Sequence, residues 1–323
     1  MLSIAIPTYN RAKLLDLLIR SHIKICIKHN IQILISDNSS TDHTQEIISK
    51  WQKKTTLIKS TRSEITLSPG QNIELALSLS STSYTWLLGD SYQLSEDLID
   101  HVIKKIQQNH KYDLFVINLG EKLSTPQSKL YADHNLLLAD LGGIMTCLSC
   151  LIFHEKILKN GAFKKYRESR FTHLGVALDF LGQSANINVV WIQEKSVTSL
   201  SHLNITKAET YHWSLGPDVI EIGFRNWVNF VFSLPDTYLQ KNKLACVKSF
   251  GKITKLATIK GFLLMRMRGQ LTNEIYKKYK FEINLVGSLP SIIVRLISIF
   301  PKWLIKILYI TATKFLNFFL RSS

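Results

Sequence analysis

The sequence has no apolar stretch long enough to cross a lipid bilayer and no secretory signal at its start. The most apolar segment, from Ile292 to Leu320, is interrupted by charged residues and by Pro301 before it nears the roughly 20 residues that a spanning helix needs. Met1 leads directly into Leu2–Ile6, whose alternation is typical of a strand. We therefore expect the N-terminal part of the chain to stay in the cytosol.

Cysteine is scarce, and its placement excludes a disulfide framework. The four cysteines, Cys26, Cys147, Cys150 and Cys246, are too few and too scattered, and a cytosolic chain would keep them reduced. Cys147 and Cys150 form a C-x-x-C, a spacing that also occurs in zinc and redox sites, but no second pair accompanies it. The surrounding run Met145–Phe153 is apolar and strand-like, so we expect both thiols to be buried structural residues.

Acidic residues are nearly absent from the last quarter of the chain. From Thr237 to Ser323 there are sixteen lysines and arginines against Glu274 and Glu282, a local charge of +14. The whole chain of 323 residues carries +16, so only +2 remains for everything before Thr237. A basic surface that binds an acidic partner is therefore expected in the C-terminal part of the chain.

What is present over the first 200 residues is a regular alternation of strand and helix patterns. The strand candidates are Leu2–Ile6, Ile31–Ser36, Leu57–Ser60, Tyr84–Leu88, Asp113–Asn118 and Val189–Ile192. This order predicts the fold class α/β, with a mostly parallel sheet covered by helices. A helix is expected from about Arg11, with Leu14, Leu15, Leu18 and Ile19 on its inner face. Further helices are expected after Asp42 as N-cap with Gln45 three residues on, from Pro69, through Leu98–Ile106 and from about Thr172.

The chain is expected to divide into two regions, residues 1–205 and residues 206–323. The stretch from Asn204 to Pro217, with its aromatic and polar Tyr211-His212-Trp213, separates the α/β pattern from a helical, lysine-rich remainder. One large domain with an extension suits a chain of this length with 46% hydrophobic residues.

In open α/β sheets, ligands bind beyond the carboxyl ends of the strands, so three loops are candidate binding elements. The first is Pro7–Arg11, whose backbone amides and arginine suit the ring and phosphates of a nucleotide at a helix N-terminus. The second, Asp37–Asp42, offers a carboxylate to a base or ribose. The third, Gly89–Tyr92, lies where a diphosphate would sit. The plain alternative is that these aspartates are turn and cap residues.

The motifs Ile4–Arg11, Ile35–Asp42 and Tyr84–Asp90, in this order and each after a predicted strand, resemble those of family 2 glycosyltransferases with the GT-A fold. The resemblance covers roughly the first 200 residues. Within the family, the chain is similar to bacterial sugar transferases that build O-antigen, capsule and lipopolysaccharide. It implies a nucleotide-diphospho-sugar donor, with base contact from Asp37. The implied binding residues are Pro7, Thr8, Tyr9, Arg11, Asp37, Asn38, Asn72, Gly89 and Asp90.

The sequence departs from the family at the motif that usually reads Asp-x-Asp. Here it reads Asp90-Ser91-Tyr92, so the carboxylate that normally holds the divalent cation is missing. Two alternatives follow: Mg²⁺ or Mn²⁺ is held by Asp90, the phosphates and water, or Arg11 and lysines neutralise the leaving diphosphate directly. An inactive relative is a third reading.

The catalytic base is expected near the start of the helix at Thr172. Sugar transferases of surface polysaccharides resemble this chain in a Phe-x-His-Leu pattern, matched by Phe171-Thr172-His173-Leu174, which makes His173 the first candidate. Glu168 and Asp179 are its rivals. The alternative is that His173 only caps or packs the helix.

The segment from Ile292 to Leu320 is expected to lie on a membrane, because apolar faces edged by lysines fit interfacial helices on anionic lipids. Nucleic acid is disfavoured as a partner, since the lysines alternate with long aliphatic faces and no nucleic-acid motif appears. The alternative is that the tail folds back onto the α/β domain or a second subunit.

These observations predict an inverting glycosyltransferase acting on a lipid-linked or surface-polysaccharide acceptor, peripheral on the cytoplasmic side of the inner membrane. A competing hypothesis, motivated by Ser91 and Tyr92, is a non-catalytic GT-A-like partner in a membrane-associated assembly.

Overall fold

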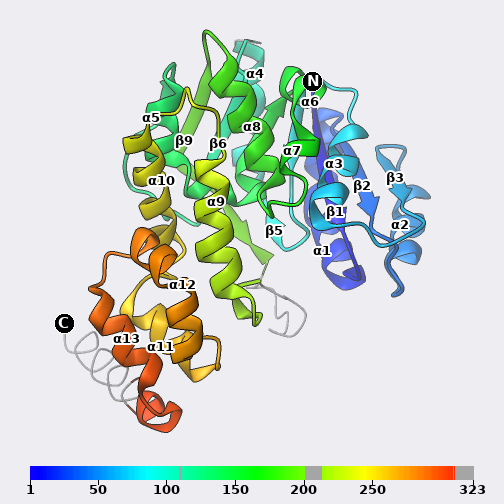
Figure 1. Ribbon diagram of the computed structural model, residues 1–323. Coiled ribbons are helices and arrows are strands. Elements are labelled where there is room, and N and C mark those ends of the chain that lie inside the picture. Colours follow the sequence, from blue (N-terminus) through cyan, green and yellow to red (C-terminus); the bar gives the residue numbers. More distant parts are fainter. Residues whose placement is uncertain (109–110, 201–212, 308, 310–323) are drawn as a thin grey trace, which may run out of the picture. The chain divides into compact units, whose positions relative to one another are not determined.

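The computed structural model describes residues 1–108, 111–200, 213–307 and 309, which form two compact units (Figure 1). The first unit comprises Met1–Tyr211 and Leu234–Leu239, and the second comprises His212–Ser233 and Gln240–Ser323. The boundary expected between residues 205 and 206 falls outside the described residues. The segment 234–239 differs from the expectation, because it packs with the first unit, where the Tyr238 hydroxyl donates to the carbonyl of Leu178 at 2.7 Å.

The first unit is built on a mixed sheet whose strand order is β3-β2-β1-β4-β8-β6-β9-β5, with β7 paired to β9. The strands are β1 (Leu2–Thr8), β2 (Gln32–Asp37), β3 (Ile58–Arg62), β4 (Tyr84–Leu87), β5 (Tyr92–Gln93), β6 (Leu114–Leu119), β7 (Lys129–Tyr131), β8 (Leu151–His154) and β9 (Val189–Ser199). The α/β prediction is confirmed.

One half of the sheet is parallel, and the other half is mixed, with β6 and β9 parallel. β1 pairs in parallel with β2 and β4, and β2 with β3, whereas β8 runs antiparallel between β4 and β6. The strand expected over Cys147–Phe153 is only β8; before it come two short 3-10 turns, Ile144–Thr146 and Leu148–Cys150. The apolar run predicted a strand there because buried turns and buried strands have the same composition.

Helices occupy the connections between the strands (Figure 1). Those of the first unit are α1 (Ala12–His29), α2 (Thr44–Gln52), α3 (Pro69–Ser78), α4 (Glu96–Gln108), α5 (His134–Leu141), α6 (Glu155–Asn160), α7 (Phe163–Tyr166) and α8 (Thr172–Gln183). The expected inner face of α1 is confirmed: Leu14, Leu15, Leu18 and Ile19 are buried against the sheet.

Two helix starts show how local sequence sets the local structure. α3 begins with a capping box, in which Ser68 and Gln71 exchange side-chain and backbone hydrogen bonds around Pro69. The box expected at Asp42 and Gln45 does not form: α2 begins at Thr44 without a side-chain cap, and Gln45 donates instead to the carboxylate of Asp37.

The second unit is helical. It contains a π-helical turn (Glu221–Asn226), α9 (Trp227–Phe232), α10 (Gln240–Ile253), α11 (Ile259–Met267), α12 (Asn273–Val286) and α13 (Ser291–Ile299). Its core is aromatic, with the rings of Trp227 and Phe250 4.7 Å apart and Phe224 and Phe262 5.9 Å apart. Of the helices described, none is long and apolar enough to cross a membrane.

Candidate active site

The carboxyl ends of β1, β2 and β4 bring the three candidate loops together. Thr8, the last residue of β1, pairs in register with Asp37, the last residue of β2. Its carbonyl accepts from the backbone N–H of Asn38 at 3.0 Å, and its hydroxyl donates to the Asp90 carboxylate at 3.2 Å. The turns that carry Thr8, Asp37 and Asp90 therefore meet at one point of the sheet edge.

Asp90 is a half-buried carboxylate with little compensation for its charge. Burial raises its pKa, whereas the nearby Arg11 guanidinium and the hydrogen bond from Thr8 act in the opposite direction without cancelling the effect. A carboxylate in this state gains from any further positive charge that approaches it.

Asp37 differs from the expectation of a base contact, because no part of it is exposed. Its carboxylate accepts from the backbone N–H of Ser40 at 3.1 Å and from the Gln45 amide, and it lies 3.8 Å from the Arg62 guanidinium. A nucleobase could reach it only if these groups moved, whereas Arg62 itself is about half exposed. Asp37 therefore stabilises the conformation of its own loop through these internal contacts.

Asn38 and Asn72 also act within the protein. The amide of Asn38 donates to the Leu67 carbonyl at 3.0 Å and accepts from the Leu67 N–H at 2.7 Å, holding the loop after β3. The amide of Asn72 accepts from the Ser36 hydroxyl at 2.7 Å and donates to the carbonyl of Thr8 at 3.4 Å. Both are buried, so they fix the strand ends.

The loop after β1 does not offer its amides to a phosphate, contrary to expectation. The N–H groups of Asn10, Arg11 and Ala12 donate to side-chain oxygens of Ser40, Thr44 and Asp42, respectively. In this loop, Tyr9 is exposed and the side chain of Arg11 is partly exposed, while Pro7 lies partly exposed within β1. Contact with an anion would therefore come from the Arg11 guanidinium.

Gly89 is held by a residue that the sequence did not single out. Its N–H donates to the hydroxyl of Ser149 at 3.0 Å, and the carbonyl of Ser149 accepts from the Trp86 indole at 2.8 Å. Ser149 is fully buried. Nothing in the local sequence marks it, because the contact joins segments 60 residues apart.

Sequence reasoning also missed Arg62 and Gln45, whose side chains lie against the Asp37 carboxylate. Arg62 could have been found, since it ends β3 and so lies at the same sheet edge as the other loops. Gln45 was assigned to a helix cap, and only the fold shows its actual partner.

His173 lies in the first turn of α8, almost completely buried. Its Nε2–H donates to the carbonyl of Thr146 at 3.1 Å, while its Nδ1 is buried and has no hydrogen-bond partner among the described residues. Burial lowers its pKa to about 4, although carbonyls of Thr146 and Met145 oppose the shift. The ring is therefore neutral at physiological pH, with its free lone pair on Nδ1.

The start of α8 packs directly on the start of α3. A Cβ on Gly70 would lie 2.4 Å from the Thr172 hydroxyl and 2.0 Å from the Arg167 carbonyl, so only glycine permits this approach. Glu168 is exposed at this junction, 3.5 Å from the hydroxyl of Ser68. Because α3 also carries Asn72, the junction connects the His173 region with the β1 edge.

Asp179 is not brought to this site. It lies six residues further along α8 than His173, about 9 Å along the helix axis. Its carboxylate accepts from Lys165 at 2.7 Å, Tyr166 at 2.8 Å and Gln183 at 2.5 Å. A buried carboxylate with three donors is a structural group.

The residues at the site fit a divalent cation only in company with a diphosphate. Across the described part of the chain, no three acidic, histidine or cysteine side chains gather as a metal centre. Tyr92, which stands in the usual ligand position, has a phenol in place of a carboxylate. Asp90 alone can supply a protein carboxylate, and Mg²⁺ commonly takes one or two carboxylates together with phosphate oxygens and water.

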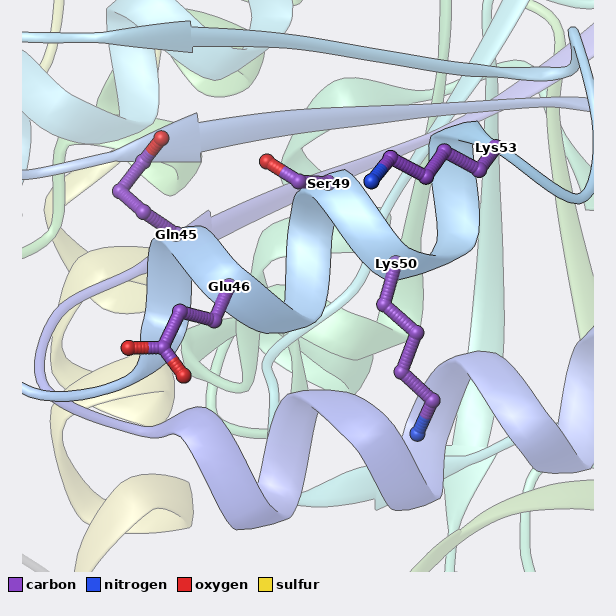
Figure 2. Close-up of a pocket in the computed structure, with 5 residues that line it drawn as sticks. All are labelled: Gln45, Glu46, Ser49, Lys50 and Lys53. Carbon is purple, nitrogen blue, oxygen red and sulfur yellow. The ribbon is translucent and has the colours of Figure 1, made fainter.

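A surface hollow of about 390 Å³ lies along α2. Figure 2 shows its lining residues, Gln45, Glu46, Ser49, Lys50 and Lys53. Lys50 forms an ion pair with Asp16 of α1 at 3.1 Å. Apart from Gln45, none of these residues takes part in the site described above.

Comparison with solved structures shows that other proteins share the fold of this chain. The structure of TarS 1–349 from S. aureus in complex with UDP-GlcNAc matches with a TM-score of 0.54 and 16% identity, over 88% of this chain and 83% of that one. A mannosyltransferase from Pyrobaculum calidifontis, PcManGT, in complex with GDP-Man and Mn²⁺, matches with a TM-score of 0.51 and 10% identity, over 92% and 85% of the two chains. The fold is thus GT-A-like.

Comparison of sequences relates the first part of the chain to sugar transferases. The abequosyltransferase RfbV of Salmonella typhimurium is 38% identical over 100 residues, which span 30% of this chain and 30% of that enzyme. The family described as glycosyl transferase family 2 matches residues 3–161, which hold the loops at the ends of β1, β2 and β4. Through this region, the chain is similar to glycosyl transferase family 2.

Proposed function

We propose that the chain is an inverting glycosyltransferase that moves a sugar from a nucleoside diphosphate donor to a lipid-linked or surface-polysaccharide acceptor. The observation that carries this proposal is the meeting of Thr8, Asp37 and Asp90 at the ends of β1, β2 and β4. This is the edge at which open α/β sheets bind nucleotides.

The relatives support a sugar-nucleotide donor. TarS was solved with UDP-GlcNAc and PcManGT with GDP-Man and Mn²⁺, and both share the fold of this chain. RfbV is named an abequosyltransferase, which is a sugar-transferring activity. The donor sugar and acceptor of this chain are proposed only as classes, because the matched region covers less than a third of RfbV.

In this proposal, Arg11 and Asp90 face the diphosphate. The guanidinium would bind phosphate oxygens directly. Asp90 would hold Mg²⁺ or Mn²⁺, which when bound would supply positive charge to the leaving diphosphate. Tyr9 and Arg62, both exposed beside the Asp37 loop, contact the nucleoside, while Gly89, Asn38, Asn72, Pro7 and Thr8 hold the strand ends in place.

The acceptor hydroxyl must give its proton to a base, and in this proposal the base is the Nδ1 lone pair of His173. Its Nε2–H is fixed on Thr146, which leaves Nδ1 as the acceptor. The pKa of about 4 makes the free imidazole a weak base, and a bound anionic diphosphate would raise it. Glu168, exposed at the α3–α8 junction, is the second candidate, whereas Asp179 is assigned to structure.

The first test is Asp90→Asn, assayed with a panel of radiolabelled nucleotide sugars. Turnover should fall at least about 100-fold, the effect of removing one group that stabilises transition-state charge. Asp236→Asn, which changes an exposed carboxylate with no ion pair in the described part of the chain, should retain parental turnover. If Asp90→Asn keeps its turnover, the site is misplaced; if the parent protein turns over no donor, it is a non-catalytic partner.

We further propose that the second unit rests on the cytoplasmic face of the inner membrane. α13 is apolar on both sides: Val294 and Ile297 are buried in the unit, while Ile292, Leu296 and Ile299 are exposed. Phe300 and Trp303, directly after the helix, are exposed as well, Trp303 to 66%. A continuous exposed apolar stripe of this kind needs a covering partner.

The positive charge beside this stripe favours anionic lipid as the covering partner. Arg295, Lys302 and Lys306 are exposed along the stripe, and the region from Thr237 onward carries +14 in sequence. Apolar side chains flanked by cations are the pattern of interfacial helices on anionic membranes. Placing the protein there brings the catalytic unit to a lipid-borne acceptor.

Flotation of the full chain with vesicles tests this placement. Binding to phosphatidylglycerol vesicles should exceed binding to phosphatidylcholine vesicles and should weaken at high salt. Leu296→Ser and Trp303→Ser should each reduce binding about tenfold, since each removes one buried apolar side chain from the contact.

The control is Ile65→Ser, an equally exposed apolar residue of the first unit, which should float like the parent. Absence of flotation, together with light scattering that shows a dimer disrupted by Leu296→Ser, would instead assign the stripe to a subunit interface.

A further inference from the structure

A mostly buried segment ahead of β8 lies against the loop that carries Asp90. The segment is Ile144–Cys150 and consists of two 3-10 turns. Ser149 and Cys150 are fully buried, whereas Cys147, between the turns, is partly exposed, contrary to the expectation that both cysteines would be buried. Because β8 follows directly and pairs antiparallel with β4, the segment lies beside the end of β4, where the Asp90 loop begins.

Ser149 holds β4 and the loop after it with two different groups. Its carbonyl accepts from the Trp86 indole at 2.8 Å, and its hydroxyl accepts from the Gly89 N–H at 3.0 Å. A Cβ on Gly89 would lie 3.2 Å from the Tyr92 ring and 3.3 Å from the Ser149 hydroxyl, so the loop and the segment are in close contact. A shift of one must therefore be felt by the other.

The Gly89 amide restrains Asp90, which is the next residue. The carbonyl of Gly89 accepts from the Tyr92 N–H at 3.0 Å, which closes the loop on itself. The Asp90 carboxylate accepts from the Thr8 hydroxyl at 3.2 Å. Asp90 is thus held through its side chain from the β1 side and through the backbone, by Ser149, from the β8 side.

We propose that Ser149 is a positioning residue of the donor site, whose hydroxyl fixes the Gly89 amide and so keeps the Asp90 carboxylate where a cation on the donor diphosphate can meet it. Its effect on sugar transfer rests on the proposed function, whereas its hold on the loop does not. Such a restraint matters because a shift of about 1 Å in a group near the reacting atoms can slow an enzyme by about 100-fold.

The same segment holds His173 through a different residue. The carbonyl of Thr146 accepts from the His173 Nε2–H at 3.1 Å. Removal of the Ser149 hydroxyl should therefore release the loop and leave the imidazole in place, whereas a collapse of the whole segment would release both.

Amide hydrogen exchange without any ligand tests the hold on the loop. In Ser149→Ala, the Gly89 amide should exchange about tenfold faster than in the parent, because it has lost one hydrogen bond. The Leu88 amide, which donates to the Ala5 carbonyl at 2.8 Å, should keep its rate. Nitrogen NMR should find the His173 proton still on Nε2. Unchanged exchange at Gly89 would overturn the proposal, as would a general loss of protection that includes Leu88 and His173.

Ser3→Ala is the matched control. Ser3 is also fully buried, but its hydroxyl is bonded to the Ser80 hydroxyl at 2.9 Å, near the end of β1 opposite Thr8. This variant should leave exchange at Gly89 and turnover per folded molecule as in the parent. If Ser149→Ala does not fold, Ser149→Cys keeps the size of the side chain with a weaker acceptor and should also speed exchange at Gly89.

A double-mutant cycle with Asp90→Asn tests the connection to catalysis. With a nucleotide sugar that the parent turns over, Ser149→Ala should lower turnover per folded molecule about tenfold, the worth of one hydrogen bond. In the Asp90→Asn background the same change should cost less than about twofold, because both act through one carboxylate. No loss in the parent, or an equal loss in both backgrounds, would overturn the positioning role.

The two proposals fail in different ways. If the parent turns over no donor, the proposed function fails, and exchange at Gly89 still decides whether Ser149 holds the loop. If the parent transfers sugar and exchange at Gly89 does not respond to Ser149→Ala, the proposed function stands and the role of Ser149 falls.

Discussion

His173 illustrates how the surroundings of a residue change its chemistry. In water, an imidazole titrates near pH 6.5, but here burial holds the pKa at about 4 and one carbonyl fixes the tautomer. The sequence pattern identified the residue, but neither the tautomer nor the direction of the pKa shift could be read from it, because both depend on the Ile144–Thr146 turn on another part of the chain.

His173→Gln separates a base from a structural histidine. The glutamine amide can reproduce the donation to Thr146 but has no basic lone pair at the position of Nδ1. If His173 is the base, kcat should fall about 100-fold or more while thermal stability stays near that of the parent. Glu168→Gln is the matched variant.

Should His173→Gln keep its kcat while Glu168→Gln loses it, the exposed carboxylate is the base. Asp179→Asn should act differently from both: it weakens a buried set of three donors and so should lower stability by about 1–3 kcal/mol with little change in kcat per folded molecule.

At the scale of elements, the first turn of α1 is tied to the loop before α2. Asp42 accepts from the Ala12 N–H with one oxygen at 3.0 Å and from the Thr44 N–H with the other at 3.0 Å. It thus satisfies one free amide at the start of each of two helices: Thr44 of α2, which follows it, and Ala12 of α1, 30 residues earlier in the chain.

Asp42→Ala should therefore lower the free energy of unfolding by about 1–2 kcal/mol, the usual cost of a lost helix cap. Urea titration followed by circular dichroism measures it. Glu64→Gln, at an exposed position of the neighbouring loop, should be neutral within about 0.5 kcal/mol. An equally neutral Asp42→Ala would show that water replaces the carboxylate.

Helices and central strands could be predicted well, because their periodic burial is a local property. Leu14, Leu15, Leu18 and Ile19 fall on the inner face of α1 as the pattern required. β5 and β7 were missed, since two- and three-residue strands carry no period. The meeting of the three loops could be predicted, because it follows from strand order. Their contacts could not be predicted, because the internal hydrogen bonds of Asp37, Asn38 and the α1 amides depend on tertiary neighbours.

At the scale of the whole molecule, buried histidines couple stability to pH. His22 is fully buried, with Nδ1–H donating to the Leu18 carbonyl at 2.7 Å and Nε2 accepting from the Leu94 N–H at 2.9 Å. Burial lowers its pKa, as it does that of His173. As pH falls, each of these histidines is therefore protonated in the unfolded chain at a higher pH than in the folded protein.

The stabilising contribution of these two neutral histidines is therefore complete above about pH 6.5, the pKa of unfolded histidine, and it is lost as pH falls toward 4. For His173, the pKa of about 4 corresponds to a loss on the order of 3 kcal/mol once the pH is below that value. Urea titrations at several pH values should show this decline, and a shallower one in His173→Gln. A flat profile between pH 6.5 and 4 would contradict the burial of both rings.

The position of β1 has a practical consequence for handling this protein. Met1 is exposed to 77%, and β1 runs from Leu2 at one edge of the sheet to Thr8 at the other, roughly 20 Å away for a strand of this length. A fluorophore or affinity handle attached at Met1 would project from the edge opposite Asp90, leaving the edge that carries Thr8, Asp37 and Asp90 open during immobilisation.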